Sequence, residues 1–533
     1  MAFTSFYFLV FLLGVLILYY TVPKRFQWVL LLIASYAFYL ISGIAQVFFL
    51  LGTTIVTYGS GLLMQKRRNR YKAELAASPD LDKEQKQLLK KKAGSDIHRI
   101  QVLTVVLDLA VLALVKYSSF AIENINDLIH FFGSESTIPG LKIIVPLGIS
   151  FYTFMAMGYI IDIGRGKYEA ERNFGKLALF LSFFPSIVQG PISRFDDVGK
   201  KLVAEHKLKY ENITYGAQLI TWGFFKKLVI ADRVAPVVNQ IFSVKMIDKL
   251  SGTTMFYGML AYAVQIYCDF SGGIDITRGV AEMMGIELPQ NFERPYFSTS
   301  VAEYWRRWHI TLGAWMREYV FYPIMLSKPI SKLSKKVKDK HGQKASKYVP
   351  SVITPFIVFL LIGIWHGANW RYVAFGLYNA VIVAGSVALD PVFKKMAEKL
   401  HIKTEGKGWK VFRIIRTFLI LGISKILVKA PSLKMAMKVL LKIFTSVNFA
   451  FGAEMVKYDF DLGYKNNIVL GVAVLIVFVV SVFQECGFHI RESISKWFIV
   501  FRWLIYFLLL IIILVFGIYG PEYDAANFIY QTY

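Results

Sequence analysis

The sequence is poor in cysteine and in charged side chains. Its two cysteines, Cys268 and Cys486, in 533 residues are too few for a disulfide framework, an iron–sulfur cluster or a cysteine-rich zinc site. Only 18% of the residues are charged, whereas a soluble domain averages about 25%. No polar stretch is long enough to fold as a separate soluble domain. These absences exclude an ordinary cytosolic enzyme.

Acidic residues are the scarcer of the charged residues. The chain has 36 Asp and Glu against 61 Lys and Arg, which gives a net charge of +25. The positive charges lie in blocks between apolar runs, a pattern typical of cytoplasmic membrane loops and unlike a nucleic-acid-binding surface. Because 56% of the residues are hydrophobic, we predict an all-α integral membrane protein in the lipid bilayer, with no nucleic acid as a partner.

Motifs for several other kinds of chemistry are missing as well. The sequence has no Cys-x-x-Cys and no His-Glu-x-x-His, so no motif supports a metal site. It has neither Gly-x-x-x-x-Gly-Lys-Ser/Thr nor Gly-x-Gly-x-x-Gly, which argues against an ATP-driven pump and a dinucleotide-dependent enzyme. Gly-x-Ser-x-Gly, the turn that carries a nucleophilic serine, is also absent.

What the sequence has instead is a series of apolar runs. A helix needs about 20 mostly apolar residues to cross a bilayer, and several of the runs are shorter or contain Gly, Pro or a charge. We therefore expect roughly ten to twelve crossings, together with re-entrant or in-plane helices. The runs are Met1–Tyr20, Phe26–Leu40, Ile44–Met64, Val102–Phe120, Ile143–Ile163, Leu177–Val188, Gly216–Val229, Met255–Tyr267, Ile353–Trp365, Tyr372–Leu389, Ile414–Leu427, Ile468–Phe483 and Trp497–Tyr519.

We interpret residues 1–533 as a single polytopic membrane domain of the plasma membrane. Its predicted parts are the N-terminal spans with a basic cytoplasmic loop (1–100), a core with two candidate histidines (101–388) and the C-terminal spans (389–533).

The orientation follows from two basic stretches. Gln65–Ile100 holds 11 Lys and Arg against 5 acids, and Ser327–Tyr348 holds 8 Lys against a single Asp. Both are predicted to be cytoplasmic, because Lys and Arg accumulate on that side. Three crossings before Gln65 then place the N-terminus outside.

His366 is the first candidate functional residue. An ionisable side chain within an apolar membrane segment is energetically costly, so its presence there usually indicates a functional role. It ends the apolar run Ile353–Trp365, in Gly363-Ile-Trp-His-Gly-Ala-Asn-Trp370. Gly363 and Gly367 permit a bend or the close approach of another backbone or a substrate. An imidazole with an ordinary pKa of about 6.5 can exchange a proton with an alcohol near neutral pH. The alternative is a histidine that only makes an interhelical hydrogen bond.

The second candidate is His309, in a segment from Glu303 to Arg317 that is dense in arginine and tryptophan. Guanidinium groups beside an apolar core can bind phosphate through paired hydrogen bonds, as a pantetheine-type carrier requires. The alternative is an interfacial helix, with tryptophan at the headgroups and arginine on lipid phosphate. The residues concerned are Trp305, Arg306, Arg307, Trp308, Trp315 and Arg317.

Polar residues interrupt other apolar runs too. Asp269 and Asp275 flank Ser271-Gly-Gly273, and lysines and acids cluster between Phe224 and Arg233. Each is a candidate for an internal ion pair or for the lining of a cavity.

Four motifs, taken in order, resemble the membrane-bound O-acyltransferase superfamily. They are Asp269-Phe-Ser-Gly, Leu288-Pro-Gln-Asn-Phe-Glu-Arg-Pro-Tyr296, Tyr304-Trp-Arg-Arg-Trp-His-Ile-Thr-Leu312 and Trp365-His-Gly-Ala-Asn-Trp370. Their order and spacing are similar to the bacterial branch with the alginate O-acetylation proteins and the D-alanine-transferring protein of teichoic acid. Residues 146–154 and the closing Phe528-Ile-Tyr530 resemble the alginate type. The resemblance runs from about Pro146 to about Tyr378.

The resemblance implies an O-acyltransferase with a ring of tilted helices around a central tunnel or funnel. It implies that His366 is the catalytic histidine and that His309 is the second motif histidine. On chemical grounds we predict that His366 acts as general base on an acceptor hydroxyl. We also predict that His309 orients the donor or stabilises the developing charge, with Asn369 as an oxyanion donor. The further candidate substrate-binding residues are Trp305, Arg306, Arg307, Trp308, Asp269, Asn291 and Trp365.

The resemblance also implies a donor and a partner. The donor would be acetyl-CoA or an acyl-carrier thioester on the cytoplasmic face, with no bound cofactor. A secreted or membrane-anchored SGNH or esterase-like protein would complete transfer, most simply of acetyl, to a cell-envelope polysaccharide. Two alternatives stay open: D-alanyl transfer to teichoic acid, and a non-enzymatic transporter. A transporter should show interrupted helices in two related halves, and the sequence has no such repeat.

Overall fold

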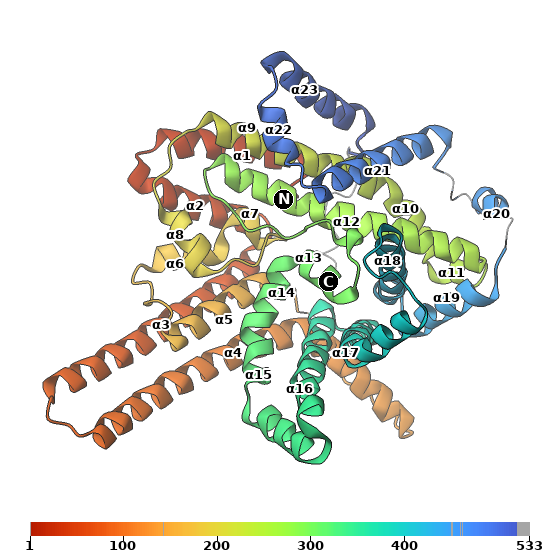
Figure 1. Ribbon diagram of the computed structural model, residues 1–533. Coiled ribbons are helices and arrows are strands. Elements are labelled where there is room, and N and C mark those ends of the chain that lie inside the picture. The colour runs from red at the N-terminus through yellow and green to blue at the C-terminus, as the bar shows by residue number, and fades with distance from the viewer. Residues whose placement is uncertain (1, 142, 449–450, 459, 461, 520–533) are drawn as a thin grey trace. The chain divides into compact units, whose positions relative to one another are not determined.

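The computed structural model describes residues 2–141, 143–448, 451–458, 460 and 462–519 (Figure 1). In this part of the chain every regular element is a helix, and the β-type pairing is limited to an isolated bridge between Phe292 and Trp308. The prediction of an all-α integral membrane protein is confirmed. Residues 528–530, which resemble the alginate type in sequence, lie outside the described residues.

The chain divides into two compact units. Unit 1 comprises residues 1–217 and 277–289, and unit 2 comprises residues 218–276 and 290–533. The chain passes between them three times: within α9 (Tyr210–Phe224), within α12 (Gly252–Met283) and after Pro289. The predicted division near residues 100 and 388 stays a prediction.

Unit 1 contains a pair of apolar N-terminal helices, a long helical hairpin and several short helices. Besides the first part of α9 and the end of α12, its elements are α1 (Phe6–Thr21), η1 (Lys24–Phe26), α2 (Gln27–Leu40), α3 (Ile44–Ala77), α4 (Lys83–Phe131), α5 (Ile149–Arg165), α6 (Phe174–Ser182), α7 (Phe184–Ile187), η2 (Phe195–Gly199) and α8 (Lys200–Val203).

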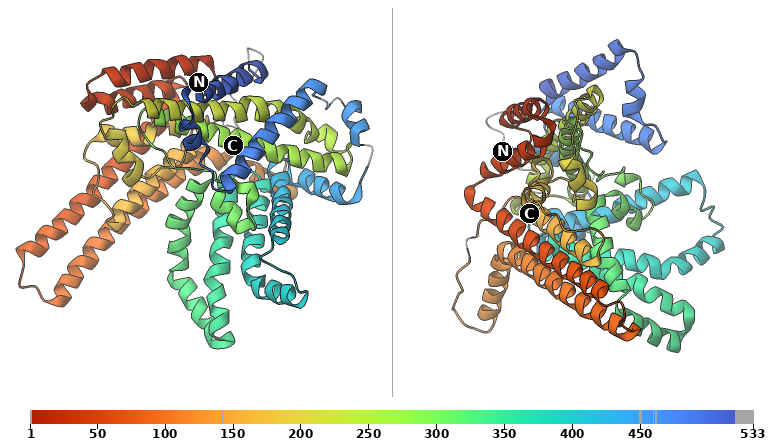
Figure 2. Two further views of the ribbon diagram at one scale, coloured as in Figure 1. Left: turned by 45° about the horizontal axis from the view of Figure 1, so that its top comes forward. Right: turned by 90° about the vertical axis from the view of Figure 1, so that its left-hand side faces the viewer.

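The long helices α3 and α4 lie side by side as an antiparallel hairpin in all views (Figures 1 and 2). Asp82 starts α4 with a capping box: its carboxylate accepts the Gln85 N–H at 2.7 Å, and the Gln85 side chain accepts the Asp82 N–H at 3.2 Å. Arg67 of α3 pairs with Asp96 of α4 at 2.7 Å. The prediction of a cytoplasmic loop over residues 65–100 is therefore wrong in its secondary structure, because the cap at Asp82 starts a helix that continues into the apolar run.

Helix α5 is the buried helix of unit 1. Most of its side chains, from Ile149 to Ile163, are buried, as expected of a helix that is apolar all round. Gly148 precedes it with φ 71°, and a Cβ there would lie 2.0 Å from the Ile187 carbonyl oxygen. Only glycine fits this entry to the helix.

Unit 2 contains all of the four motifs except Leu288 and Pro289, together with the C-terminal helices. Besides the end of α9 and most of α12, its elements are η3 (Phe225–Ala231), α10 (Asp232–Ile241), α11 (Val244–Ile247), η4 (Pro295–Phe297), α13 (Val301–Arg307), α14 (Ile310–Met316), η5 (Arg317–Phe321), α15 (Tyr322–Met325), α16 (Lys328–His366), α17 (Trp370–Lys399), α18 (Lys407–Lys429), α19 (Leu433–Thr445), α20 (Phe451–Lys457), α21 (Tyr464–Glu485), α22 (Ile490–Ser495) and α23 (Ile499–Phe516).

Helices α16 and α17 pack against each other through glycine. A Cβ on Gly363 would lie 2.4 Å from the Tyr372 carbonyl oxygen and 2.8 Å from the Gly376 Cα. A Cβ on Gly367 would lie 2.4 Å from the Tyr372 ring. Gly363 therefore permits the close backbone approach that the sequence predicts, and Gly367 makes room for the Tyr372 ring.

Six helices among the described residues are long and apolar enough to cross a membrane, and α1 is a shorter apolar helix. A multi-pass membrane protein is thus confirmed. Other predicted runs fall on helices that are too short to cross alone, such as α2 and α6. The total of ten to twelve crossings, the ring of tilted helices and the outside N-terminus stay predictions. The six are α3, α4, α16, α17, α21 and α23.

Candidate functional site

The second and third motifs meet through the backbone. The Glu293 N–H donates to the Arg307 carbonyl at 2.9 Å, and the Ile310 N–H donates to the Asn291 carbonyl at 3.0 Å. The stretch that follows Asn291 is therefore paired with the end of α13 and the start of α14. This pairing brings two motifs that are separate in the sequence into one local structure.

His309 precedes α14 in a left-handed backbone conformation, with φ 49° and ψ 53°. Such a conformation costs a residue with a side chain about 1–3 kcal/mol, although histidine occupies it more often than most. The His309 Nδ1 lies 3.3 Å from the Asn291 Oδ1, which also accepts the N–H and the hydroxyl of Thr311, each at 3.0 Å. Asn291 therefore fixes both the His309 ring and the backbone that follows it.

The His309 imidazole is held in its neutral form. Its side chain is 2% exposed and lies outside the six candidate spans. Burial lowers the pKa of His309 well below its ordinary value, and the neighbouring His366 lowers it further. A neutral ring keeps one nitrogen as a hydrogen-bond donor and the other as an acceptor.

His366 is the last residue of α16 and lies next to the same tryptophan as His309. The ring centroids of Trp365 and His366 are 5.0 Å apart, and those of Trp365 and His309 are 6.0 Å apart. On their other sides His366 contacts Phe375 at 5.4 Å and His309 contacts Phe270 at 4.9 Å. Unit 2 thus brings both candidate histidines, which are distant in the sequence, into one aromatic environment.

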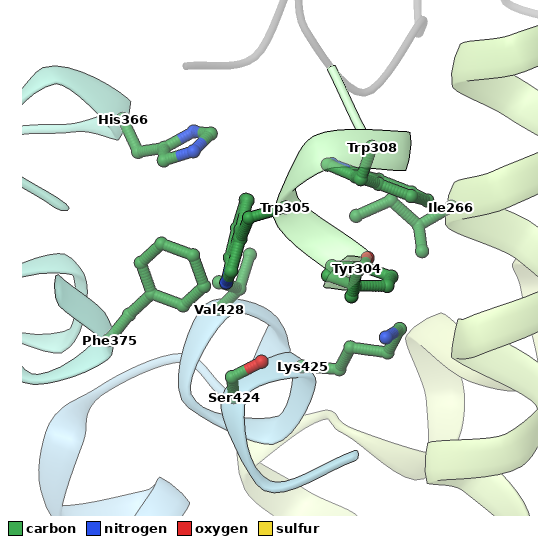
Figure 3. Close-up of a pocket in the computed structure, with 9 residues that line it drawn as sticks. All are labelled: Ile266, Tyr304, Trp305, Trp308, His366, Phe375, Ser424, Lys425 and Val428. Carbon is green, nitrogen blue, oxygen red and sulfur yellow. The ribbon is translucent and has the colours of Figure 1, made fainter. Parts of the chain in front are cut away.

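A cavity of about 40 Å³ opens beside His366. Figure 3 shows His366 and Phe375 on one side of it, Trp305 in the middle, and Tyr304 and Trp308 on the other side. This volume holds about three water molecules, so the lining must move before a carrier-linked acyl group can enter. The lining residues are Ile266, Tyr304, Trp305, Trp308, His366, Phe375, Ser424, Lys425 and Val428.

Trp305 is oriented by a residue that the sequence analysis missed. Its Nε1–H donates to the Asn379 Oδ1 at 3.2 Å, and the Asn379 Nδ2–H donates to the Phe375 carbonyl at 2.9 Å. The Asn379 side chain is fully buried. A polar residue inside the apolar run Tyr372–Leu389 is the kind of signal that singled out His366, so Asn379 could have been found.

The two motif arginines lie in different surroundings. Arg307 forms ion pairs with Glu303 at 2.8 Å and with Glu485 at 2.9 Å. Arg306 is exposed, and neither arginine lines the cavity. Arg307 is therefore already bound by protein carboxylates, whereas Arg306 faces outward and can meet a phosphate. Nothing in the sequence pattern indicated Glu485 as the partner.

Asp269 belongs to a buried ion cluster. The Lys227 Nζ lies 2.5 Å from Asp269 and 2.8 Å from Asp232, and all three side chains are almost fully buried. The sequence left two interpretations of this polar stretch, an internal ion pair and the lining of a cavity. The structure shows the internal ion pair, and Asp269 does not line the cavity beside His366. The next residue, Phe270, contacts His309, so the cluster anchors a neighbour of the site.

Asn369 is the N-cap of α17. Its side-chain oxygen accepts the Arg371 N–H at 3.1 Å, which satisfies one of the free backbone donors at the helix start. The predicted oxyanion role therefore depends on its side-chain Nδ2–H. Asn369 does not line the cavity, and its role stays a prediction.

Comparison with known proteins fits this arrangement. Residues 172–338 match the family model for MBOAT, the membrane-bound O-acyltransferase family. The chain is 29% identical to "Probable alginate O-acetylase AlgI" of Pseudomonas aeruginosa, over 93% of this chain and 84% of the relative. It is 31% identical to the protein of the same name from Pseudomonas syringae pv. tomato, over 82% of this chain and 74% of the relative. It is also 30% identical to "Teichoic acid D-alanyltransferase" of Bacillus subtilis, over 52% of this chain and 67% of the relative.

The protein is thus an integral membrane acyltransferase. It belongs to the membrane-bound O-acyltransferase family. Its activity is O-acyl transfer, and the alternative of a non-enzymatic transporter has no support.

Proposed function

We propose that the protein moves an acetyl group from a cytoplasmic thioester across the membrane for O-acylation of an extracellular cell-envelope polysaccharide, with His366 as the general base. The donor is acetyl-CoA or an acyl-carrier thioester, and the reaction uses no resident cofactor. The observation that carries the proposal is the position of His366. Its ring lines the cavity, and Trp365 connects it to His309, the second motif histidine.

The chemistry needs a base and a stabiliser of negative charge. His366 removes the proton of the acceptor hydroxyl while its oxygen attacks the thioester carbonyl. The tetrahedral intermediate then collapses to the ester, and the proton passes to the departing thiolate. General-base catalysis of this kind contributes about 10²–10⁴ in rate.

His309 and Asn369 serve the donor and the charge that develops on its carbonyl oxygen. The neutral His309 ring donates its Nδ1–H to the Asn291 Oδ1, so its Nε2 is an acceptor that orients the donor, and the Asn369 Nδ2–H donates to the oxyanion. A preorganised donor of this kind is worth about 10²–10³ in turnover. Trp305 and Trp308 line the cavity, and Trp365 contacts both histidines. In these aromatic surroundings electrostatic interactions are stronger than in water.

Charge and topology account for the donor and the acceptor. Arg306 and the basic segments Gln65–Ile100 and Ser327–Tyr348 attract a phosphate-bearing carrier to the cytoplasmic face. The N-terminus lies outside, and the acyl group leaves on that side. There an SGNH or esterase-like partner, secreted or membrane-anchored, completes transfer to the polysaccharide.

The relatives support acetyl transfer first and D-alanyl transfer second. The matches to the two proteins named as alginate O-acetylases cover more of this chain than the match to the protein named as a teichoic acid D-alanyltransferase. D-alanyl transfer to teichoic acid is therefore the second candidate, with a carrier protein as the donor.

The test compares cells that carry the intact chain, a His366→Ala variant and no chain. Base-labile acetate and base-labile D-alanine are both measured in the isolated cell envelope, at equal membrane abundance of the chain. We expect acetate to fall with His366→Ala to the level of cells without the chain. His341→Ala, on the exposed surface of α16, is the matched control and should leave acetate unchanged.

Two results would contradict the proposal. Unchanged acetate in the His366→Ala cells would make His366 a packing histidine. Loss of D-alanine in place of acetate would favour the second candidate.

A further inference from the structure

Lys425 of α18 is a buried cation that faces the cavity. Its side chain is 5% exposed, and it lines the same cavity as His366. Its Nζ lies 5.0 Å from the ring centre of Tyr296 and 5.2 Å from that of Tyr304. No carboxylate of the described residues forms an ion pair with it.

Other buried lysines of unit 2 are matched by acids. Lys227 lies between Asp269 and Asp232, and Lys226 lies 2.7 Å from Asp275. Burial of a charge is costly unless the charge is paired. The tyrosine faces offset part of this cost for Lys425 by cation–π attraction, but they accept no N–H hydrogen bonds of ordinary strength. The environment of Lys425 therefore suits an anion that the protein does not itself supply.

The tyrosines around Lys425 are held in place. The Tyr296 hydroxyl donates to the Ala263 carbonyl at 2.6 Å, and the rings of Tyr296 and Tyr304 stack with centroids 6.3 Å apart. Tyr304 in turn stacks on Trp308 at 5.5 Å. These contacts hold the two tyrosine rings beside the Lys425 ammonium group.

Figure 3 shows how Lys425 lies relative to the proposed base. The Lys425 Nζ points away from His366, and Trp305 stands between the two in this view. Lys425 is therefore placed to bind a part of the substrate that is remote from the hydroxyl which loses its proton. This position differs from that of an oxyanion donor, which would lie beside the reacting carbonyl.

We propose that Lys425 binds an anionic group of the substrate, a carboxylate or a phosphate, in a subsite separated from His366 by Trp305. The inference rests on the proposed function, because the subsite belongs to the same cavity. The anionic group comes from the donor, as a phosphate of its carrier, or from the acceptor, as a carboxylate or phosphate of the polysaccharide.

The first test is binding to the full-length chain in detergent. The probes are coenzyme A, dephosphorylated pantetheine and a uronic-acid oligosaccharide with its carboxyl-reduced, neutral counterpart. Lys425→Met should weaken the binding of one of the two anionic probes at least ten-fold, because a charge-assisted hydrogen bond is worth about that much. The binding of the neutral counterpart of that probe should stay unchanged. Loss with coenzyme A assigns the anion to the donor, and loss with the uronic-acid probe assigns it to the acceptor.

Two variants control for charge and for folding. Lys425→Arg keeps the charge and should restore most of the binding. Lys429→Met removes a lysine one turn further along α18, where its Nζ donates to Asn239 at 2.6 Å, and should bind both probes like the unaltered chain. Equal binding of every probe by Lys425→Met and by the unaltered chain would overturn the inference.

Kinetics in membranes separate this inference from the proposed function. With acetyl-CoA and the native polysaccharide, Lys425→Met should raise the KM for the charged substrate about ten-fold and change kcat less than two-fold. A fall in kcat at unchanged KM would overturn the inference in favour of a direct role in the chemical step. If the unaltered chain transfers no acetyl group, the proposed function fails, and the binding test still decides the role of Lys425.

Discussion

Glu485 binds Arg307 through both of its carboxylate oxygens, with Oε2 2.9 Å from Nη1 and Oε1 3.3 Å from Nη2. Glu485 ends α21, and Arg307 ends α13, which carries Trp305 into the cavity. Glu485 also lies 2.8 Å from Arg294 of the second motif. One acidic residue therefore fastens two motifs to a distant helix of unit 2.

We expect Glu485→Gln to destabilise unit 2. The change removes the charge that pairs with Arg307 and Arg294, and charge-assisted hydrogen bonds contribute about 1.5–3 kcal/mol each, less where water reaches them. A loss of about 1–3 kcal/mol in the free energy of unfolding should appear in denaturation of the detergent-solubilised chain. Glu492→Gln, on the exposed surface of α22, should cause no measurable change. Equal stability of both variants would show that the Glu485 network is dispensable.

Gly363→Ala should separate α16 from α17 near His366. A Cβ there meets the Tyr372 carbonyl and the Gly376 Cα at distances shorter than any normal contact, and overpacking typically costs about 1–3 kcal/mol. We expect lower thermal stability together with reduced acyl transfer. Gly385→Ala lies on α17 with nothing within 4 Å of the added Cβ and should be neutral or slightly stabilising. Wild-type behaviour of Gly363→Ala would mean that the helices can part without effect on the site.

Asn291→Ala should disturb His309 more than Thr311→Val does. The alanine variant removes the acceptor for the Thr311 N–H, the Thr311 hydroxyl and the His309 ring together. The valine variant removes only the hydroxyl. We expect acyl transfer to fall at least ten-fold in Asn291→Ala and by less in Thr311→Val, measured as acetate in the cell envelope at equal abundance. The opposite order would place the important contact at the Thr311 hydroxyl.

The folding stability should depend on pH through His309. Its pKa in the folded chain lies well below the ordinary value of about 6.5, so below this pH the denatured chain binds a proton that the folded chain does not. Above pH 6.5 the free energy of unfolding does not depend on His309 protonation. As the pH falls below 6.5, the free energy of unfolding decreases by about 1.4 kcal/mol per pH unit through His309. Denaturation at pH 7.0, 6.0 and 5.5 should show a smaller loss for His309→Gln than for the unaltered chain. Parallel curves would mean that the His309 ring is not kept neutral by the fold.

The helical membrane fold and the two histidines could be predicted from the sequence because both signals are local. Apolar runs mark helices, and a histidine inside or at the end of such a run is conspicuous. In the structure both histidines contact Trp365 in unit 2. Composition and periodicity alone do not indicate that the two histidines lie close together.

The partners of the site were harder to predict, because their contacts join distant parts of the chain. Glu485 and Arg307 lie on helices far apart in the sequence, and no periodicity relates them. Lys425 stands inside the apolar run Ile414–Leu427 and meets the rule that singled out His366, yet its role emerges only when α13 and α18 face the same cavity. The helical hairpin over residues 65–100 was missed because a high density of charge resembles a loop, while the cap at Asp82 and the ion pair of Arg67 stabilise helix.

The lengths of α3 and α4 have a consequence for encounters in the aqueous phase. At 1.5 Å per residue, the charged end of α3 after Met64 extends about 20 Å, and the matching start of α4 runs back beside it. This pair of helices forms a stiff rod that carries its turn, residues 78–82, at the tip. In the cytoplasmic placement proposed above for residues 65–100, the length of the rod sets the distance at which a soluble carrier first meets these charged residues, so shortening the rod by whole helical turns would change that distance without touching the site.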